Sequence, residues 1–140
     1  MSNVINLKIN AIQHIGIPVT DITASQVFYR HLGFTNVMQA SFTDNGGTGT
    51  CVMMQRENMT IELYQLPDAG LAEIKARSNG HIDHVAFDVS DIDEAFKVIT
   101  EAGFNVLEPE PVFLQFWKNG CKYFNITGPD GERLEFNQIL

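Results

Sequence analysis

The stretch His14-Ile-Gly-Ile-Pro-Val-Thr-Asp-Ile22 recurs as His84-Val-Ala-Phe-Asp-Val-Ser-Asp-Ile92, at an offset of 70 residues. Each copy runs on to a Gly-Phe pair at the same offset, Gly33-Phe34 in the first and Gly103-Phe104 in the second. An internal repeat of this kind constrains the architecture before any single residue is interpreted. The chain is therefore predicted to consist of two half-modules of the same design.

Each copy has the pattern of a buried strand followed by a helix. Residues 12–20 are apolar and β-branched, Thr20 and Asp21 both suit a helix N-cap, and glycine ends the helical pattern. In the second copy Asp91 opens a capping-box sequence. Three strand-like segments follow the helix of the first half. The second half offers Val112–Trp117, Lys122–Thr127 and Arg133–Gln138, preceded by the short segment Asn105–Leu107. Each half thus reads β-α-β-β-β, which makes the fold class α+β.

We expect a single domain over residues 1–140, because the chain is of one-domain length and has no low-complexity linker. Module 1 takes about residues 10–66, a joint with a short helix takes 67–80, and module 2 takes about 81–138.

The net charge of −8 argues against a nucleic-acid partner, which needs clustered Lys and Arg. No apolar run is long enough to cross a bilayer, and the first residues lack the pattern of a signal peptide. We therefore expect a cytoplasmic protein that binds a small molecule and neither nucleic acid nor membrane.

One histidine and one glutamate stand at matched places in each half. His14 and His84 open the first strands, and Glu62 and Glu135 lie in the last strands between large apolar residues. Alone, such a histidine is usually structural and such a glutamate usually faces solvent. Their duplication favours a metal site, and two nitrogens with two carboxylates suit Zn²⁺, Ni²⁺, Co²⁺, Mn²⁺ and Fe²⁺ alike.

The remaining histidines and cysteines are interpreted as structural. His31 falls near a helix C-terminus, and His81 has no repeat partner, although it stands close enough to His84 to support it. Cys51 and Cys121 lie in different halves and look like small side chains buried in strands.

These motifs resemble the vicinal oxygen chelate superfamily, which includes glyoxalase I, methylmalonyl-CoA epimerase, fosfomycin- and bleomycin-resistance proteins and extradiol dioxygenases. The resemblance spans about residues 10–138 and rests on four pieces of sequence: His14-x-Gly-Ile-x-Val-x-Asp, Phe28-Tyr29-x-x-Leu32-Gly33-Phe34, His84-x-Ala-Phe-x-Val-x-Asp-Ile and Asp130-Gly-x-x-Leu-Glu-Phe136.

The resemblance implies two tandem βαβββ modules whose curled mixed sheets form a metal cleft, with one divalent ion held by His14, Glu62, His84 and Glu135. Four ligands favour the glyoxalase I pattern over the patterns that use three. By that analogy Glu135 is the principal catalytic base, and Glu62 is a ligand and a second acid or base. The expected activity is that of a lyase or isomerase that acts on a small hemithioacetal or α-hydroxycarbonyl through a metal-stabilised enediolate.

Other positions depart from glyoxalase I and leave the substrate open. Pro18 and Leu66 stand where the bacterial enzyme has Arg and Asn, so the sequence does not support glutathione as the thiol. Phe116 and Trp117 are either a wall of an apolar substrate pocket or ordinary sheet packing. The alternatives are a non-enzymatic small-molecule binding or antibiotic-resistance protein, an epimerase like that for methylmalonyl-CoA, and a dioxygenase. The superfamily resemblance also implies a homodimer.

Overall fold

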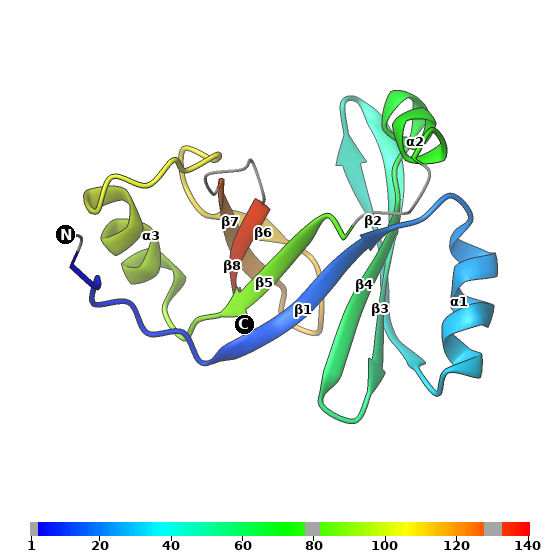
Figure 1. The fold of residues 1–140 in the computed structure, drawn as a ribbon, viewed down its shortest axis with the longest axis horizontal. Helices are drawn as coiled ribbons and strands as arrows, with labels where there is room; N and C mark the ends of the chain where they lie inside the picture. Colours follow the sequence, from blue (N-terminus) through cyan, green and yellow to red (C-terminus); the bar gives the residue numbers. More distant parts are fainter. Residues whose placement is uncertain (1–2, 78–81, 128–132) are drawn as a thin grey trace. The chain divides into compact units, whose positions relative to one another are not determined.

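The computed structural model describes residues 3–77, 82–127 and 133–140. Those residues form eight strands and three helices (Figure 1), in the order β1 (Ala11–Pro18), α1 (Ile22–His31), β2 (Thr35–Asp44), β3 (Gly47–Arg56), β4 (Met59–Gln65), α2 (Asp68–Lys75), β5 (His84–Asp88), α3 (Ile92–Glu101), β6 (Val112–Leu114), β7 (Cys121–Thr127) and β8 (Arg133–Ile139). Each repeat therefore gives β-α-β-β-β, and the predicted α+β class is confirmed. The short helix predicted in the joint is α2.

The chain forms two compact units. Unit 1 combines Met1–Gln13 with His84–Leu140, and unit 2 is His14–Asp83. The boundaries at His14 and His84 coincide with the start of the two repeats.

In unit 2 the strand order is β2-β3-β4-β1, with β1 parallel to β4 and the other neighbours antiparallel. One face of these strands packs against α1 in an apolar core that includes Val52, Met54 and Leu63, with Ile22 and Tyr29 of the helix. Neighbouring residues of a strand face opposite ways. The strand residues that alternate with Val52, Met54 and Leu63 therefore lie on the face away from α1.

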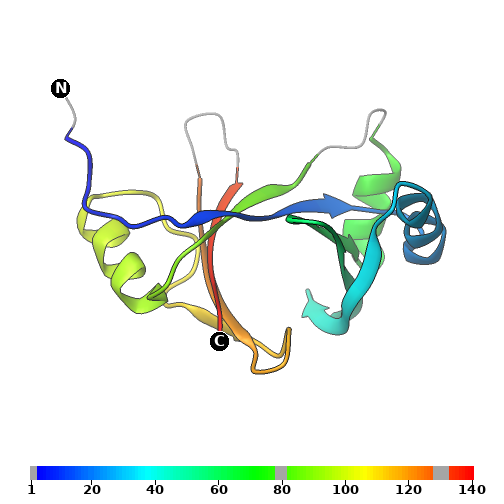
Figure 2. The same ribbon diagram turned by 90° about the horizontal axis from the view of Figure 1, so that it is seen from below.

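Unit 1 repeats this plan with the order β5-β8-β7-β6, in which β5 is parallel to β8. Its core joins Ile92, Ala95 and Ile99 of α3 to Phe124 and Phe136 of the strands. Figure 2 shows α3 beside the strands of this unit. Burial of a helix stripe against one sheet face is the main source of stability for such a layer pair.

The two helices that follow the repeated strands begin in the same way. Asp21 accepts hydrogen bonds from the backbone N–H groups of Thr23 and Ala24 at 3.1 and 3.0 Å, and Asp91 accepts one from Glu94 at 3.0 Å. Both aspartates were predicted as N-caps. A side-chain oxygen here satisfies helix donors that have no partner within the helix.

A second contact at each helix start was not predicted. The backbone N–H of Ile22 donates to Gln65 Oε1 at 2.9 Å, and that of Ile92 donates to Gln138 Oε1 at 3.0 Å. Gln65 is the last residue of β4 and Gln138 is the next to last of β8, the two strands that carry the glutamates. The helix start is thereby fixed to the strand on which the candidate site residue lies.

Two predicted strands are shorter in the structure. Of residues 105–107, Val106 alone forms a single bridge, to Ile126, because Pro109 and Pro111 that follow have no N–H to continue a ladder. The strand predicted for Val112–Trp117 ends at Leu114.

Both cysteines are buried in strands, as predicted, with Cys51 in β3 and Cys121 in β7. His31 is the last residue of α1, also as predicted. His81 and residues 128–132 lie outside the described residues. None of the helices within the described residues is long and apolar enough to cross a membrane.

Candidate functional site

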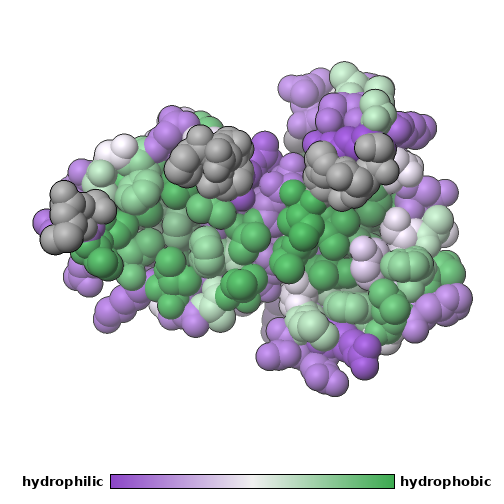
Figure 3. Space-filling view, in the orientation of Figure 1, coloured by the Kyte–Doolittle hydropathy of each residue, from purple (hydrophilic) through white to green (hydrophobic). Residues whose placement is uncertain are grey.

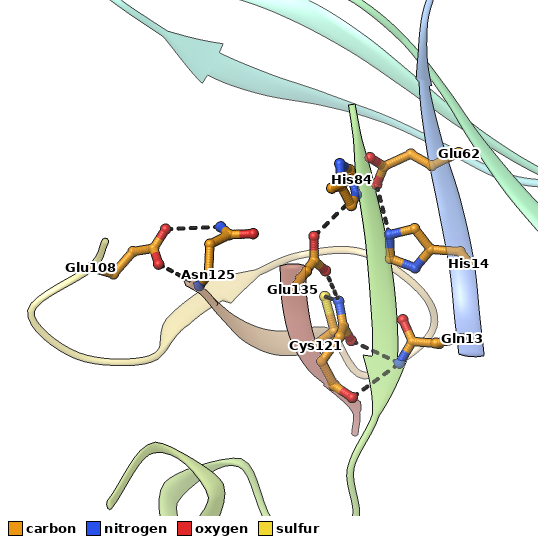
Figure 4. Close-up of polar contacts among 9 residues, drawn as sticks. Gln13, His14, Glu62, His84, Glu108, Cys121, Asn125 and Glu135 are labelled. Atoms are coloured by element: carbon orange, nitrogen blue, oxygen red, sulfur yellow. Dashed lines mark hydrogen bonds and ion pairs between the residues drawn. The ribbon is translucent and has the colours of Figure 1, made fainter. Parts of the chain in front are cut away.

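Unit 1 brings together His84 and Glu135, the histidine and glutamate of the second repeat. His84 opens β5 and Glu135 lies in the middle of β8, and both side chains are buried. His84 Nε2 lies 3.1 Å from Glu135 Oε2 (Figure 4). The register partner of Glu135 on β5 is Ala86, two residues after the histidine. A small residue there leaves room for the carboxylate to reach across to the imidazole.

The electrostatics of Glu135 favour proton uptake. Burial of the carboxylate raises its pKa, because a charged group loses its water. His84 and the hydrogen bond from Asn137 act in the opposite direction, and the charge of Glu108 adds to the increase in the pKa. Burial is the dominant cause, and a carboxyl with a raised pKa suits a general base that must hold and release a proton.

Asn137 holds Glu135 in place from the same strand. Its Nδ2 donates to Glu135 Oε1 at 2.7 Å, and its Oδ1 accepts from Gln13 Nε2 at 3.1 Å. Gln13 also donates to Asp88 Oδ1 at 3.1 Å, and Asn137 Nδ2 lies 3.9 Å from the sulfur of Cys121. Asn137 was not among the predicted site residues, although its position two residues after Glu135 puts it on the same strand face.

A second buried amide lies next to this carboxylate. Asn125 in β7 is the register partner of Glu135 in β8, so their side chains share one face. The backbone N–H of Asn125 donates to Glu108 Oε1 at 2.6 Å, and its Nδ2 donates to Glu108 Oε2 at 2.9 Å. Asn125 Oδ1 is buried and has no hydrogen-bond partner among the described residues. Neither residue was predicted, since a contact from a proline-rich loop to a strand follows no sequence period.

Unit 2 brings together His14 and Glu62, the pair of the first repeat. His14 in β1 is almost completely buried, and its Nε2 lies 3.8 Å from Glu62 Oε2 in β4 (Figure 4). The register partner of Glu62 is Gly16, again two residues after the histidine. The arrangement of strand, small residue and carboxylate is therefore the same in both units.

The donor atoms of each pair fit a divalent metal ion. Two atoms that bind one Zn²⁺ at about 2.1 Å, with an angle between tetrahedral and right-angled, lie about 3.0–3.4 Å apart. The His84–Glu135 separation of 3.1 Å falls in this range, and the His14–Glu62 separation of 3.8 Å is somewhat longer. Imidazole nitrogen and carboxylate oxygen are ligands for Zn²⁺, Ni²⁺, Co²⁺, Mn²⁺ and Fe²⁺.

Phe116 and Trp117 do not belong to a strand. Phe116 is buried, and Trp117 lies in the loop between β6 and β7 with a φ of 64°. That left-handed backbone is costly for a bulky residue and is found chiefly where function or tight packing requires it. The indole Nε1 of Trp117 is buried and lacks a hydrogen-bond partner within the part of the chain that the structure describes.

The comparisons with known proteins agree on the family. The model of the Glyoxalase/Bleomycin resistance protein/Dioxygenase superfamily matches residues 11–136. The "Uncharacterized protein YwbC" of Bacillus subtilis (strain 168) is 30% identical over 128 residues, which are 91% of this chain and 96% of the relative. The "Uncharacterized protein YwkD" of the same strain is 30% identical over 107 residues, 76% of this chain and 80% of the relative.

Among solved structures, the methylmalonyl-CoA epimerase from Mycobacterium tuberculosis is similar with a TM-score of 0.78 and 17% identity, over 99% of this chain and 93% of the epimerase. At that identity the likeness concerns the fold. Together with the match over residues 11–136, it places the repeated βαβββ plan among known proteins. The chain belongs to the glyoxalase, bleomycin resistance protein and dioxygenase superfamily.

Proposed function

We propose that this protein is a metal-dependent lyase or isomerase of the glyoxalase I type, which acts on a small hemithioacetal or α-hydroxycarbonyl. The observation that carries the proposal is the pair of one imidazole and one carboxylate in each unit. His84 and Glu135 are both buried, and His14 is buried beside the partly buried Glu62, whose side chain is 13% exposed. Burial of a carboxylate is costly unless a cation or hydrogen bonds compensate for it. A duplicated pair of this kind is better explained by a bound ion than by two unrelated ion pairs.

In this proposal His14, Glu62, His84 and Glu135 hold one divalent ion, with Zn²⁺ or Ni²⁺ as the first candidates and Co²⁺, Mn²⁺ or Fe²⁺ as the others. The four residues come from the two repeats in equal number. Either one chain supplies all four, or the two pairs come from different copies in a homodimer.

The residues of the chain would move the proton. Glu135 is the proposed base: its carboxylate takes the proton bound to one substrate carbon and returns it to the neighbouring carbon. Burial raises the pKa of Glu135 in the protein without metal, and this effect of burial favours uptake of the proton. Asn137 keeps one carboxylate oxygen in place by its hydrogen bond of 2.7 Å. The ion, when bound, would stabilise negative charge on the two substrate oxygens, and Glu62 is the proposed second acid or base.

The proposed substrate pocket includes Phe116 and Trp117. Support comes from the left-handed backbone of Trp117 and from its buried indole N–H, which a bound molecule with an acceptor atom would satisfy. The proposal does not name the thiol of the substrate. Pro18 and Leu66 stand where the enzyme that this chain resembles has the residues that recognise glutathione.

A homodimer is part of the proposal. Helix α1 buries none of its residues completely, and Val27 and Phe28 are about half exposed, as is Leu32 at its C-cap. Figure 3 shows hydrophobic surface on its right-hand side, where Figure 1 has α1. Apolar side chains gathered on one helix are a common feature of subunit interfaces. Light scattering after size exclusion is expected to give twice the mass of 15.7 kDa.

Metal analysis of protein purified without chelator tests the metal. We expect one divalent ion for each set of four ligands, its loss in His84→Ala and Glu62→Ala, and its retention in the control His31→Ala, which changes an exposed histidine at the end of α1. Protein without metal that stays unable to bind Zn²⁺ or Ni²⁺ would contradict the proposal and favour a binding protein without a metal.

Activity is tested with methylglyoxal and a panel of thiols on the metal-loaded protein. Glu135→Gln is expected to lose at least about a hundredfold in kcat, the usual contribution of a general base. Turnover of methylmalonyl-CoA without thiol would favour an epimerase, and consumption of oxygen with a catechol would favour a dioxygenase.

A further inference from the structure

The amide of Asn125 has one satisfied end and one unsatisfied end. Its Nδ2 and its backbone N–H both donate to the carboxylate of Glu108, at 2.9 and 2.6 Å. A carboxylate accepts hydrogen bonds and cannot donate them, so the nitrogen of the amide must face Glu108. The orientation of the amide is therefore fixed, and Oδ1 points away from Glu108.

The free end of this amide lies on the side of the candidate base. Asn125 and Glu135 are register partners across β7 and β8, and Figure 4 shows Oδ1 turned toward the side on which Glu135 lies. The Asn125 side chain is 94% buried, since its exposed fraction is 6%. Within the described residues nothing donates to Oδ1. A buried acceptor left without a donor is costly, and such atoms in native proteins usually meet a ligand or an ordered water.

We infer that Asn125 Oδ1 accepts a hydrogen bond from the bound ligand, and that the ligand therefore carries a hydroxyl or N–H group next to the atoms that react at Glu135. This inference rests on the proposed function, because that function places the substrate at Glu135. It narrows the substrate class to molecules with a donor at this position, such as an α-hydroxycarbonyl or a hemithioacetal. Molecules that offer only carboxylate and thioester oxygens there are disfavoured.

The charge of Glu108 supports the same choice. A carboxylate held by Nδ2 gives Asn125 a fixed dipole with its negative end at Oδ1, and the negative charge behind it repels a second anion. A hydrogen-bond donor at Oδ1 is stabilised by the amide dipole and by the negative charge of Glu108. Asn125 is thus a specificity-determining residue whose amide is oriented before the ligand arrives.

Two matched probes test the inference. Acetohydroxamate and N-methylacetohydroxamate carry the same pair of oxygens, and only the first has an N–H. Their dissociation constants are measured by calorimetry on the Ni²⁺-loaded wild-type protein. On the metal-free protein the hydroxyl of either probe could also donate, so the O-methyl ethers of the two probes are used there, and their dissociation constants are measured by following the backbone amide signal of Asn125 in two-dimensional NMR. We expect the N–H probe to bind about tenfold more tightly, as one neutral hydrogen bond to a buried acceptor predicts.

Variants connect that preference to the amide. Asn125→Leu is expected to bind both probes equally, whereas the control Asn105→Leu, which changes an exposed amide of unit 1, is expected to keep the preference. Asn125→Leu also removes a contact to Glu108, so the double variant Asn125→Asp/Glu108→Gln serves as the rescue. It exchanges donor and acceptor across the pair, keeps an oxygen at the free end and is expected to keep the preference.

The outcomes separate the two proposals. Protein that binds no metal but shows the preference in NMR would contradict the proposed function and support the role of Asn125. Protein that binds metal and both probes equally would overturn the role of Asn125 and leave the metal site standing. Absence of binding by either probe in both states would also overturn it. In that case an ordered water is the donor to Oδ1.

Discussion

Gln138 in β8 accepts a hydrogen bond at 3.0 Å from the backbone N–H of Ile92, the first residue of α3. Gln65 in β4 does the same for Ile22 at 2.9 Å in the other unit. Each glutamine stands three residues after the glutamate of its module, so Glu-x-x-Gln is a second duplicated motif. It joins the strand of the carboxylate to the start of the helix.

The first prediction concerns this bond. Gln138→Ala is expected to lower the free energy of unfolding by about 1 kcal/mol, because a half-buried helix donor loses its acceptor. That corresponds to a fall in Tm of about 3–4 °C for a chain of this size. Gln138→Glu keeps an oxygen at the same place and serves as the control. Thermal unfolding of both variants decides the matter, and equal Tm values for wild type and Gln138→Ala would contradict the role given to this residue.

The second prediction concerns the small residue beside each carboxylate. Ala86→Val adds two methyl groups at a fully buried position next to Glu135 and is expected to displace that carboxylate. The affinity for Ni²⁺ or Zn²⁺ should fall at least tenfold in calorimetry, while circular dichroism stays that of the wild type. Val85→Ile, on the opposite strand face, is the control. Wild-type metal affinity in Ala86→Val would show that the space beside Glu135 is not required.

The third prediction is a pH dependence of stability in metal-free protein. Burial raises the pKa of Glu135, so the folded state takes up a proton at a pH where the unfolded state has already lost it. The contribution of Glu135 to stability is therefore greatest below the ordinary pKa of a glutamate and decreases as the pH rises through the raised pKa. Urea unfolding with chelator present, compared with a variant that cannot lose this proton, should show this decrease.

Glu135→Gln is the reference for that experiment, because it removes the charge and keeps the shape. The difference in unfolding free energy, wild type minus variant, is expected to become less favourable to the wild type as pH increases from about 4.5 upward. His84 and Asn137 act against the shift and reduce its size. A difference that stays constant with pH, or grows in favour of the wild type, would contradict the prediction.

The fourth prediction concerns Trp117. Its indole N–H is buried without a partner in the described part of the chain, so Trp117→Phe removes an unsatisfied donor and is expected to leave Tm unchanged or slightly higher. If the indole binds substrate, the same change should raise KM about tenfold and affect kcat little. A clear fall in Tm with unchanged KM would assign Trp117 to packing alone.

The internal repeat predicted the order of the strands and helices and the paired site residues, because a residue type that recurs at the same place in both halves stands out from chance occurrences. His14 with His84 and Glu62 with Glu135 stood out through their matched positions, and the structure pairs each histidine with the glutamate of its own unit. The same comparison predicted both aspartate N-caps. Gln65 and Gln138 carried the same signal, and a search for matched polar residues at the ends of the last strands would have found them.

Contacts between a loop and a strand could not be predicted from the sequence pattern. Glu108 and Asn125 have no counterparts in the first repeat, and their contact joins a loop to a strand 17 residues away. The strand predicted to reach Trp117 ends early, since hydrophobic residues in a loop look like strand residues until their backbone angles are known. Such contacts depend on tertiary packing, which a single sequence does not encode as a period.

Unit 1 is built from two separate pieces of chain, Met1–Gln13 and His84–Leu140, and Gln13 carries hydrogen bonds to Asp88 and Asn137 that help to hold the carboxylate of Glu135. The natural order of the chain therefore crosses between the units twice. A circular permutant that starts at His84, passes from residue 140 through a linker to residue 1 and ends at Asp83 would cross once, with each unit contiguous. The first 13 residues thus belong to the second module in space, although the whole first module separates them from it in the sequence.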